Sequence, residues 1–317
     1  MNTSAIATSK PLTRATRPPH PLARVIAWEL RRFGASRMFW VQALAFFFLL
    51  LLVMWGQRAP QQFGAGNVST GQMINGFVAG TSAWGLLHTL PTSLVLLVLL
   101  LPFITADGVT RDLQRRTHEL VMTTVMPVWA YVWGRYLTGL LMSIGLALLM
   151  LAAILGMGLL LHLTVSDYPL PSTDALIVLW AGMVVPATIL VASLGFALST
   201  LFPSLSTPVK VVILLAWIIG ALVIPTGLAN TTPPGWYVNW DPTSAVTARG
   251  LLSQYSISDL LRTATNAAQF QTAFVPIENK MPAIGSWFAS HLVLAGLSVG
   301  LVLIVPLAFR RSREVIA

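Results

Sequence analysis

Six long stretches of this sequence contain no charged residue and consist almost entirely of apolar side chains. They are Met38–Gly56, Trp84–Ile104, Tyr136–Leu161, Ala175–Phe202, Val211–Leu228 and Trp287–Phe309. A helix needs about 20 apolar residues to cross a membrane, and a charge at mid-membrane costs roughly 2.5–3.5 kcal/mol. The sequence therefore predicts an all-α integral membrane protein with six transmembrane helices, in a transmembrane domain that covers residues 38–309.

The composition excludes a soluble fold. Charged residues make up 9% of the chain and hydrophobic residues 56%, whereas about 25% of a typical soluble domain is charged. The chain contains no cysteine, which excludes disulfides and thiolate metal sites. We therefore expect every large apolar surface to face lipid or another helix.

Basic residues predict the orientation of the spans. Six spans place both termini on one side, and 15 of the 19 Lys and Arg residues then lie on that side. The positive-inside rule assigns this side to the cytosol. The net charge of +9 is thus explained by topology and by attraction to anionic membrane lipids, so no nucleic acid partner is expected. We expect a multi-pass protein of the cell membrane, most simply a bacterial cytoplasmic membrane.

The two ends of the chain are basic and differ in pattern. Residues 1–20 are rich in Thr, Ser, Pro and basic residues, which predicts a disordered arm, and residues 310–317 form a basic cytosolic tail. Residues 21–37 have one apolar helical face and predict an amphipathic helix on the inner membrane surface. Glu29 falls within that apolar face. Two interpretations remain open: a carboxylate buried against another element, or a salt bridge to Arg32 three residues later.

The link between spans two and three, residues 107–135, is the most polar cytosolic segment. Thr117 can cap a helix, Glu119 suits its first turn, and Pro127 limits it. The predicted helix Thr117–Thr124 has about two turns, too few to be stable alone, so it needs a partner surface. His118 and Glu119 also begin a zinc-protease motif, but Met122 replaces its second histidine. No metal site is expected.

The outer segment, residues 229–286, contains aromatic residues typical of a membrane interface. Trp236, Tyr237 and Trp240 are candidates for an outer gate or lid. A second helix is predicted from Ser258 through Phe274. The segment either covers the exit of a pathway or forms a passive cap, and the sequence leaves both open.

Several motifs are missing from the sequence. No span contains Asp, Glu, Lys or Arg, which argues against a proton- or sodium-coupled carrier. The chain has no phosphate-binding loop and no nucleophile elbow. It is therefore not expected to be an enzyme. If it moves a substrate actively, the energy has to come from another subunit.

The link and the N-terminal helix resemble the permeases of ABC type-2 transporters. The residues that carry the resemblance are Thr117, Glu119, Leu120, Thr124, Trp129, Tyr131, Gly134 and Arg135, with Trp28–Arg32 in the N-terminal helix. The six-span layout and the enlarged last outer loop are also similar. Arg116 and Val125 stand where the family usually has Gly and Pro, so the start and end of the short helix are expected to differ in shape.

The resemblance implies the permease subunit of an ATP-driven exporter. Such a subunit pairs with a second permease, in a homo- or heterodimer, and binds two cytosolic ATPase subunits that hold ATP and Mg²⁺. This chain itself would hold no cofactor. The residues implied in coupling to the ATPase are Thr117, Glu119, Leu120, Thr124, Arg135 and Glu29. The alternatives are a stand-alone carrier or channel, and a membrane scaffold or assembly factor.

Overall fold

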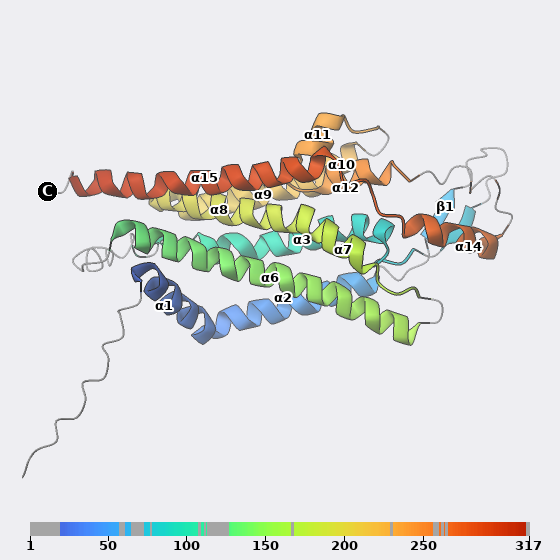
Figure 1. Ribbon diagram of the computed structural model, residues 1–317, viewed down its shortest axis with the longest axis horizontal. Coiled ribbons are helices and arrows are strands. Elements are labelled where there is room, and N and C mark those ends of the chain that lie inside the picture. Colours follow the sequence, from blue (N-terminus) through green and yellow to red (C-terminus); the bar gives the residue numbers. More distant parts are fainter. Residues whose placement is uncertain are drawn as a thin grey trace, which may run out of the picture.

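The computed structural model describes residues 20–56, 61–64, 73–76, 78–106, 109, 110, 112, 127–165, 168–228, 231–255, 260, 263 and 266–314. Within these ranges six helical segments are long and apolar enough to cross a membrane. They are α2 (Arg37–Gly56), α3 (Ala83–Thr105), α6 (Val128–Thr164), the segment Thr173–Leu201, the segment Pro203–Gly227, and α15 (Ser286–Glu314), which is apolar as far as Leu307. The long helices run side by side along the longest axis (Figure 1). The six predicted spans are confirmed as helices.

Two of the spans are interrupted by a wide π turn just before a proline. The fourth span consists of α7 (Thr173–Leu179), the π turn η1 (Trp180–Val184) and α8 (Val185–Leu201). The fifth consists of the 3₁₀ turn η2 (Pro203–Leu205), α9 (Ser206–Ile218), the π turn η3 (Ile219–Val223) and α10 (Ile224–Gly227). Pro186 and Pro225 follow the π turns and have no N–H to donate to the preceding turn. Backbone carbonyls are thereby left for other donors.

The spans differ in how much of their surface the protein covers. α3 and the fourth span are the most buried, and they contact each other and α6. α2 and α9 instead expose broad apolar faces, which include Leu44, Phe48 and Leu52 on α2 and Val212 and Leu215 on α9. Apolar faces of this kind are stable against lipid or against another membrane helix.

The N-terminal helix α1 (Pro21–Ala35) lies at an angle to α2 and packs against α6. Val25 and Glu29 are buried, whereas Arg24 and Arg31 are exposed. Gly134 makes this packing possible, because a Cβ at its position would lie 2.6 Å from Val25 Cγ1. A larger residue there would separate the two helices.

The end of the molecule opposite α1 carries the shorter elements (Figure 1). These are the antiparallel strands β1 (Gln61–Gly64) and β2 (Met73–Gly76), and helices α11 (Gly235–Trp240), α12 (Ala245–Leu252) and α14 (Ala267–Glu278). The strand pair was not predicted, so the fold is helical with one small β ribbon. The predicted helix from Ser258 through Phe274 is interrupted at Asn266 and extends beyond Phe274 to Glu278, while its predicted start at Ser258 lies outside the described residues. The Asn266 side chain accepts the Gln269 N–H and starts α14 afresh.

Several predicted segments differ from the structure or lie outside the described residues. α6 begins at Val128, eight residues before the predicted start of the third span, so Arg135 lies two turns inside a helix. α15 continues to Glu314, into the predicted tail. The basic arm 1–19 and the predicted coupling helix Thr117–Thr124 lie outside the described residues.

Candidate functional site: a buried charge cluster joining α1 and α6

Arg135 is the centre of a buried cluster of charges that joins three parts of the chain. Its Nη1 lies 2.8 Å from Glu29 Oε1 of α1, and its Nη2 pairs with Asp112 Oδ2, at the start of the link between α3 and α6. Arg32 Nε lies 3.2 Å from the other Glu29 oxygen. Two arginines thus face two carboxylates, and the four charges balance.

The centre of the cluster, Arg135 with Glu29, is almost completely shielded from solvent, whereas the Asp112 side chain is 16% exposed and that of Arg32 is 33% exposed. The Arg135 side chain is 3% exposed and that of Glu29 is 2% exposed. The Arg135 guanidinium lies 5.2 Å from the ring centroid of Trp28 and 5.1 Å from that of Tyr131. The Tyr131 hydroxyl also donates to Asp112 Oδ2 at 2.5 Å. Buried charges of this kind interact strongly, and removal of one partner leaves the other as an uncompensated buried charge.

An ion pair joins the two ends of the polar segment between α3 and α6. Asp112 stands at the start of the link and Arg135 lies beyond its end, within α6, and the ion pair holds the two together. Glu29 attaches α1 to the same point. The start of the link, α1 and α6 are therefore joined at one buried point.

The predicted coupling residues have different outcomes. Glu29 and Arg135 are brought into direct contact, and both interpretations of Glu29 hold, because it pairs with Arg32 and with another element. Thr117, Glu119, Leu120 and Thr124 lie outside the described residues. Sequence reasoning missed Asp112. The available signal was an acidic residue near the start of a basic link, with Arg135 at the other end of the same polar segment, residues 107–135.

A second polar network joins the N-terminal part of α15 to the π turn η1. His291 Nδ1 donates to the Gly182 carbonyl at 2.9 Å, and its Nε2 lies 3.3 Å from Thr247 Oγ1 of α12. In a regular helix the N–H of residue 186 would donate to the Gly182 carbonyl, but Pro186 has no N–H, so this carbonyl needs another donor. Asp241 accepts the Val246 N–H at 2.6 Å and so caps α12. The network ties α12 and α15 to the interrupted fourth span.

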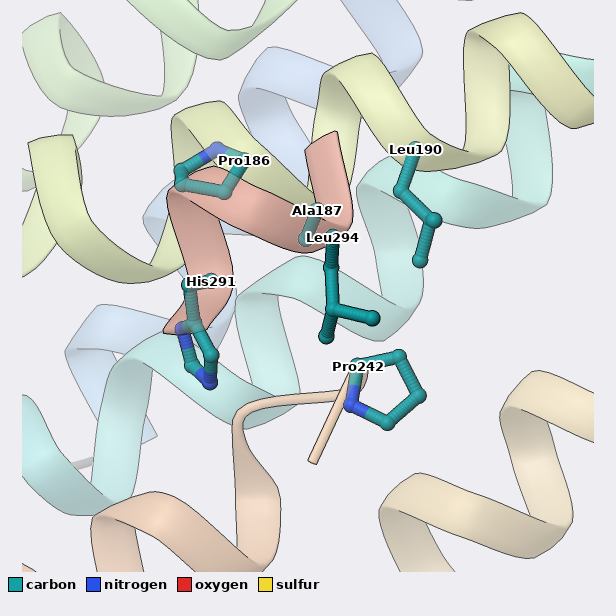
Figure 2. A pocket seen from close by; sticks show the side chains of 6 residues that line it. All are labelled: Pro186, Ala187, Leu190, Pro242, His291 and Leu294. Atoms are coloured by element: carbon teal, nitrogen blue, oxygen red, sulfur yellow. The ribbon is translucent and has the colours of Figure 1, made fainter. Parts of the chain in front are cut away.

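A small cavity adjoins this network, between α8, α15 and the turn before α12. Figure 2 shows the ring of His291 and the side chain of Leu294 on one side and Pro242 on the other. Its volume is about 10 Å³, about enough for one water molecule. This cavity is therefore too small to pass a substrate.

The aromatic residues predicted as a gate lie on α11. Trp236 is 69% exposed and Trp240 45% exposed, while the Trp236 and Tyr237 rings stack with centroids 5.3 Å apart. Exposed tryptophans at one end of a helical bundle are typical of a membrane interface. Nearby in the chain but separate in space, α14 packs Phe270 and Phe274 against Val78 near the start of α3.

Glu278, at the end of α14, is also buried. Its Oε2 accepts the Ala79 N–H at 3.3 Å, and Ser82 contributes a further hydrogen bond. Burial raises the pKa of Glu278 to about 7, while the hydrogen bonds from Ala79 and Ser82 oppose that change. The Glu278 side chain therefore links α14 to the turn that starts α3.

Among the described residues no group of His, Asp and Glu could hold a metal ion.

Comparison with known proteins assigns the chain to a family. No curated protein matches the chain. The sequence profile of the family described as ABC-2 family transporter protein matches residues 75–309, well over half of the 317 residues, and includes five of the six spans and Arg135. The chain therefore belongs to the ABC-2 transporter family of membrane permeases.

Proposed function

We propose that this chain is the permease subunit of an ATP-driven exporter and that the charge cluster around Arg135 transmits motion from a separate ATPase. The ATPase subunits, two per assembly, would contact residues 117–124 on the cytosolic side. Because the link is held at Asp112 and Arg135, movement of that contact would shift α6 and α1 together. This closed link is the observation that supports the proposal.

The cluster suits such a role because its central charge, Arg135, keeps both carboxylate partners only while the three elements stay together. An ion pair at the end of a flexible loop would absorb a displacement. Here Glu29 and Arg135 are nearly inaccessible, so separating them without a matching movement of α1 costs several kcal/mol. The elements are therefore expected to move as one body when the spans switch between inward- and outward-facing states.

The translocation path is proposed to form with a second permease subunit. The cavity beside His291 is too small for a substrate, and α2 and α9 expose broad apolar faces. A homo- or heterodimer could cover part of these faces and enclose a path between the subunits. The distribution of basic residues supports a cytosolic location for both termini, and α14 and α11 would then lie at the outer exit.

The experiment is to reconstitute the permease with its ATPase in lipid and to measure binding and ATP turnover separately. Arg135→Gln should leave the ATPase bound through residues 117–124 but reduce substrate-stimulated turnover at least tenfold. Arg31→Gln is the matched control, because Arg31 is an exposed arginine of α1. Full stimulation in Arg135→Gln would contradict the proposed transmission, and absence of any ATPase binding to the wild-type chain would contradict the exporter assignment.

A further inference from the structure

A groove lies at the α1 end of the molecule, between α1, α2 and the end of α3. Its volume is about 400 Å³, within the range of small-molecule sites. It is lined by Arg32, Phe33, Ser36, Met38, Phe39, Gln42, Phe103 and Ile104. None of these residues belongs to the second polar network around His291.

The walls of the groove are of two kinds. One wall consists of the rings of Phe33, Phe39 and Phe103 with Ile104, and the other carries the guanidinium of Arg32 and the amide of Gln42. A site with one apolar and one hydrogen-bonding wall suits a ligand that has both a polar head and a hydrocarbon part.

Gln42 is the most informative of these residues. It is the only amide or charged side chain in the apolar run Met38–Gly56. Among the described residues no hydrogen bond to its side chain is found, and an amide without a partner in a membrane costs several kcal/mol. Gln42 stands five residues after Arg37, or about 7–8 Å deeper along the helix axis. With Arg37 among the headgroups, as expected for a basic residue that flanks a span, Gln42 lies near the boundary between headgroups and hydrocarbon.

The charge around the groove is positive. α1 and α2 together contain Arg24, Arg31, Arg32 and Arg37 but one carboxylate, Glu29, which gives a net charge of +3. Lys210 of α9 is 8% exposed, and its Nζ lies 5.5 Å from the centroid of the Phe103 ring. Basic residues at a membrane surface attract anionic headgroups, and Lys210, which does not itself line the groove, adds a cation behind the Phe103 ring of its α3 wall.

From this combination we infer that the groove binds the phosphate headgroup of an anionic phospholipid, in the leaflet at the α1 end. The phosphate lies against the exposed part of the Arg32 guanidinium, whose Nε pairs with Glu29, and is attracted at longer range by Lys210 behind Phe103. The Gln42 amide donates to the ester region, and the first methylenes pack on Phe39 and Phe103. The inference does not rest on the proposed exporter function, since a bound lipid could be cargo or a structural component.

The test uses the absence of native cysteine. A bimane label at Met38→Cys reports on the groove, and the same label at Leu44→Cys, on the exposed opposite face of α2, is the matched control. Nanodiscs of phosphatidylcholine contain an equal small fraction of brominated phosphatidylglycerol or brominated phosphatidylcholine. The ratio of quenching by the two brominated lipids measures local selectivity and cancels differences in depth.

The ratio should be several-fold above one at position 38 and near one at position 44. Lys210→Gln should lower the ratio at position 38 by up to about fivefold, the effect of one basic residue near a membrane surface, whereas Lys210→Arg should preserve it. Gln42→Leu should reduce quenching at position 38 by both brominated lipids. Equal ratios at the two positions in the wild-type background, or a ratio at position 38 that Lys210→Gln leaves unchanged, would overturn the inference.

Discussion

Removal of Arg135 should release α1 from α6. In Arg135→Gln the Asp112 carboxylate loses its arginine, and Glu29 keeps only Arg32, at 3.2 Å. Breaking a buried pair by removing one partner typically costs about 3–5 kcal/mol. Because Glu29 retains one cation, we expect about 3 kcal/mol, the lower end of that range. The fraction of molecules with α1 detached should then rise roughly 100-fold.

The assay follows the reaction of a buried thiol. Val25 is 5% exposed and faces Gly134, so Val25→Cys should react with a maleimide only when α1 leaves α6. We expect Arg135→Gln to raise the labelling rate roughly 100-fold. The control Arg31→Gln changes an exposed residue and should alter the rate no more than about twofold.

A second thiol distinguishes detachment of α1 from general unfolding. Met54, on α2, is fully buried, so Met54→Cys should remain unreactive in the Arg135→Gln background. If Val25→Cys reacts at the same rate in Arg135→Gln and in Arg31→Gln, the cluster does not hold α1. If Met54→Cys becomes reactive as well, the cluster stabilises the whole helical bundle and not only the contact between α1 and α6.

Three further predictions concern other parts of the chain. Glu119→Arg should weaken ATPase binding tens- to thousands-fold in a pull-down, because a charge pair across an interface is worth about 2–5 kcal/mol; unchanged binding and turnover would refute a contact at Glu119. Gln114→Cys should react with impermeant maleimide only from the cytosolic side, and labelling from outside intact cells would reverse the proposed orientation. Glu278 binds its proton with a folded pKa of about 7, above its ordinary 4.5, so its contribution to stability is complete below pH 4.5 and is lost as pH rises to 7. The midpoint temperature of thermal unfolding should therefore fall between pH 5 and pH 8 more steeply in the wild type than in Glu278→Gln. Parallel pH profiles of the two proteins would exclude this role of Glu278.

The membrane fold could be predicted because it depends on local composition. A spanning helix satisfies its own backbone hydrogen bonds, so a run of about 20 apolar residues is sufficient to specify it. The bounds were less predictable where a helix continues through polar residues. α6 includes Arg135 and Tyr131 because their polar atoms find partners on α1 and at Asp112, which no pattern within α6 could show.

The sequence alone thus determined the six helices, their apolar surfaces and the segment that resembles the family motif. Only the tertiary structure decided which charges meet. Glu29 had an adequate partner within its own helix, Arg32, and spacing could not reveal that Arg135, over a hundred residues away, lies 2.8 Å from its other oxygen. The same holds for His291 and the Gly182 carbonyl. Such pairs form because packing excludes water from both partners, and that exclusion depends on the arrangement of separate helices rather than on neighbours in the chain.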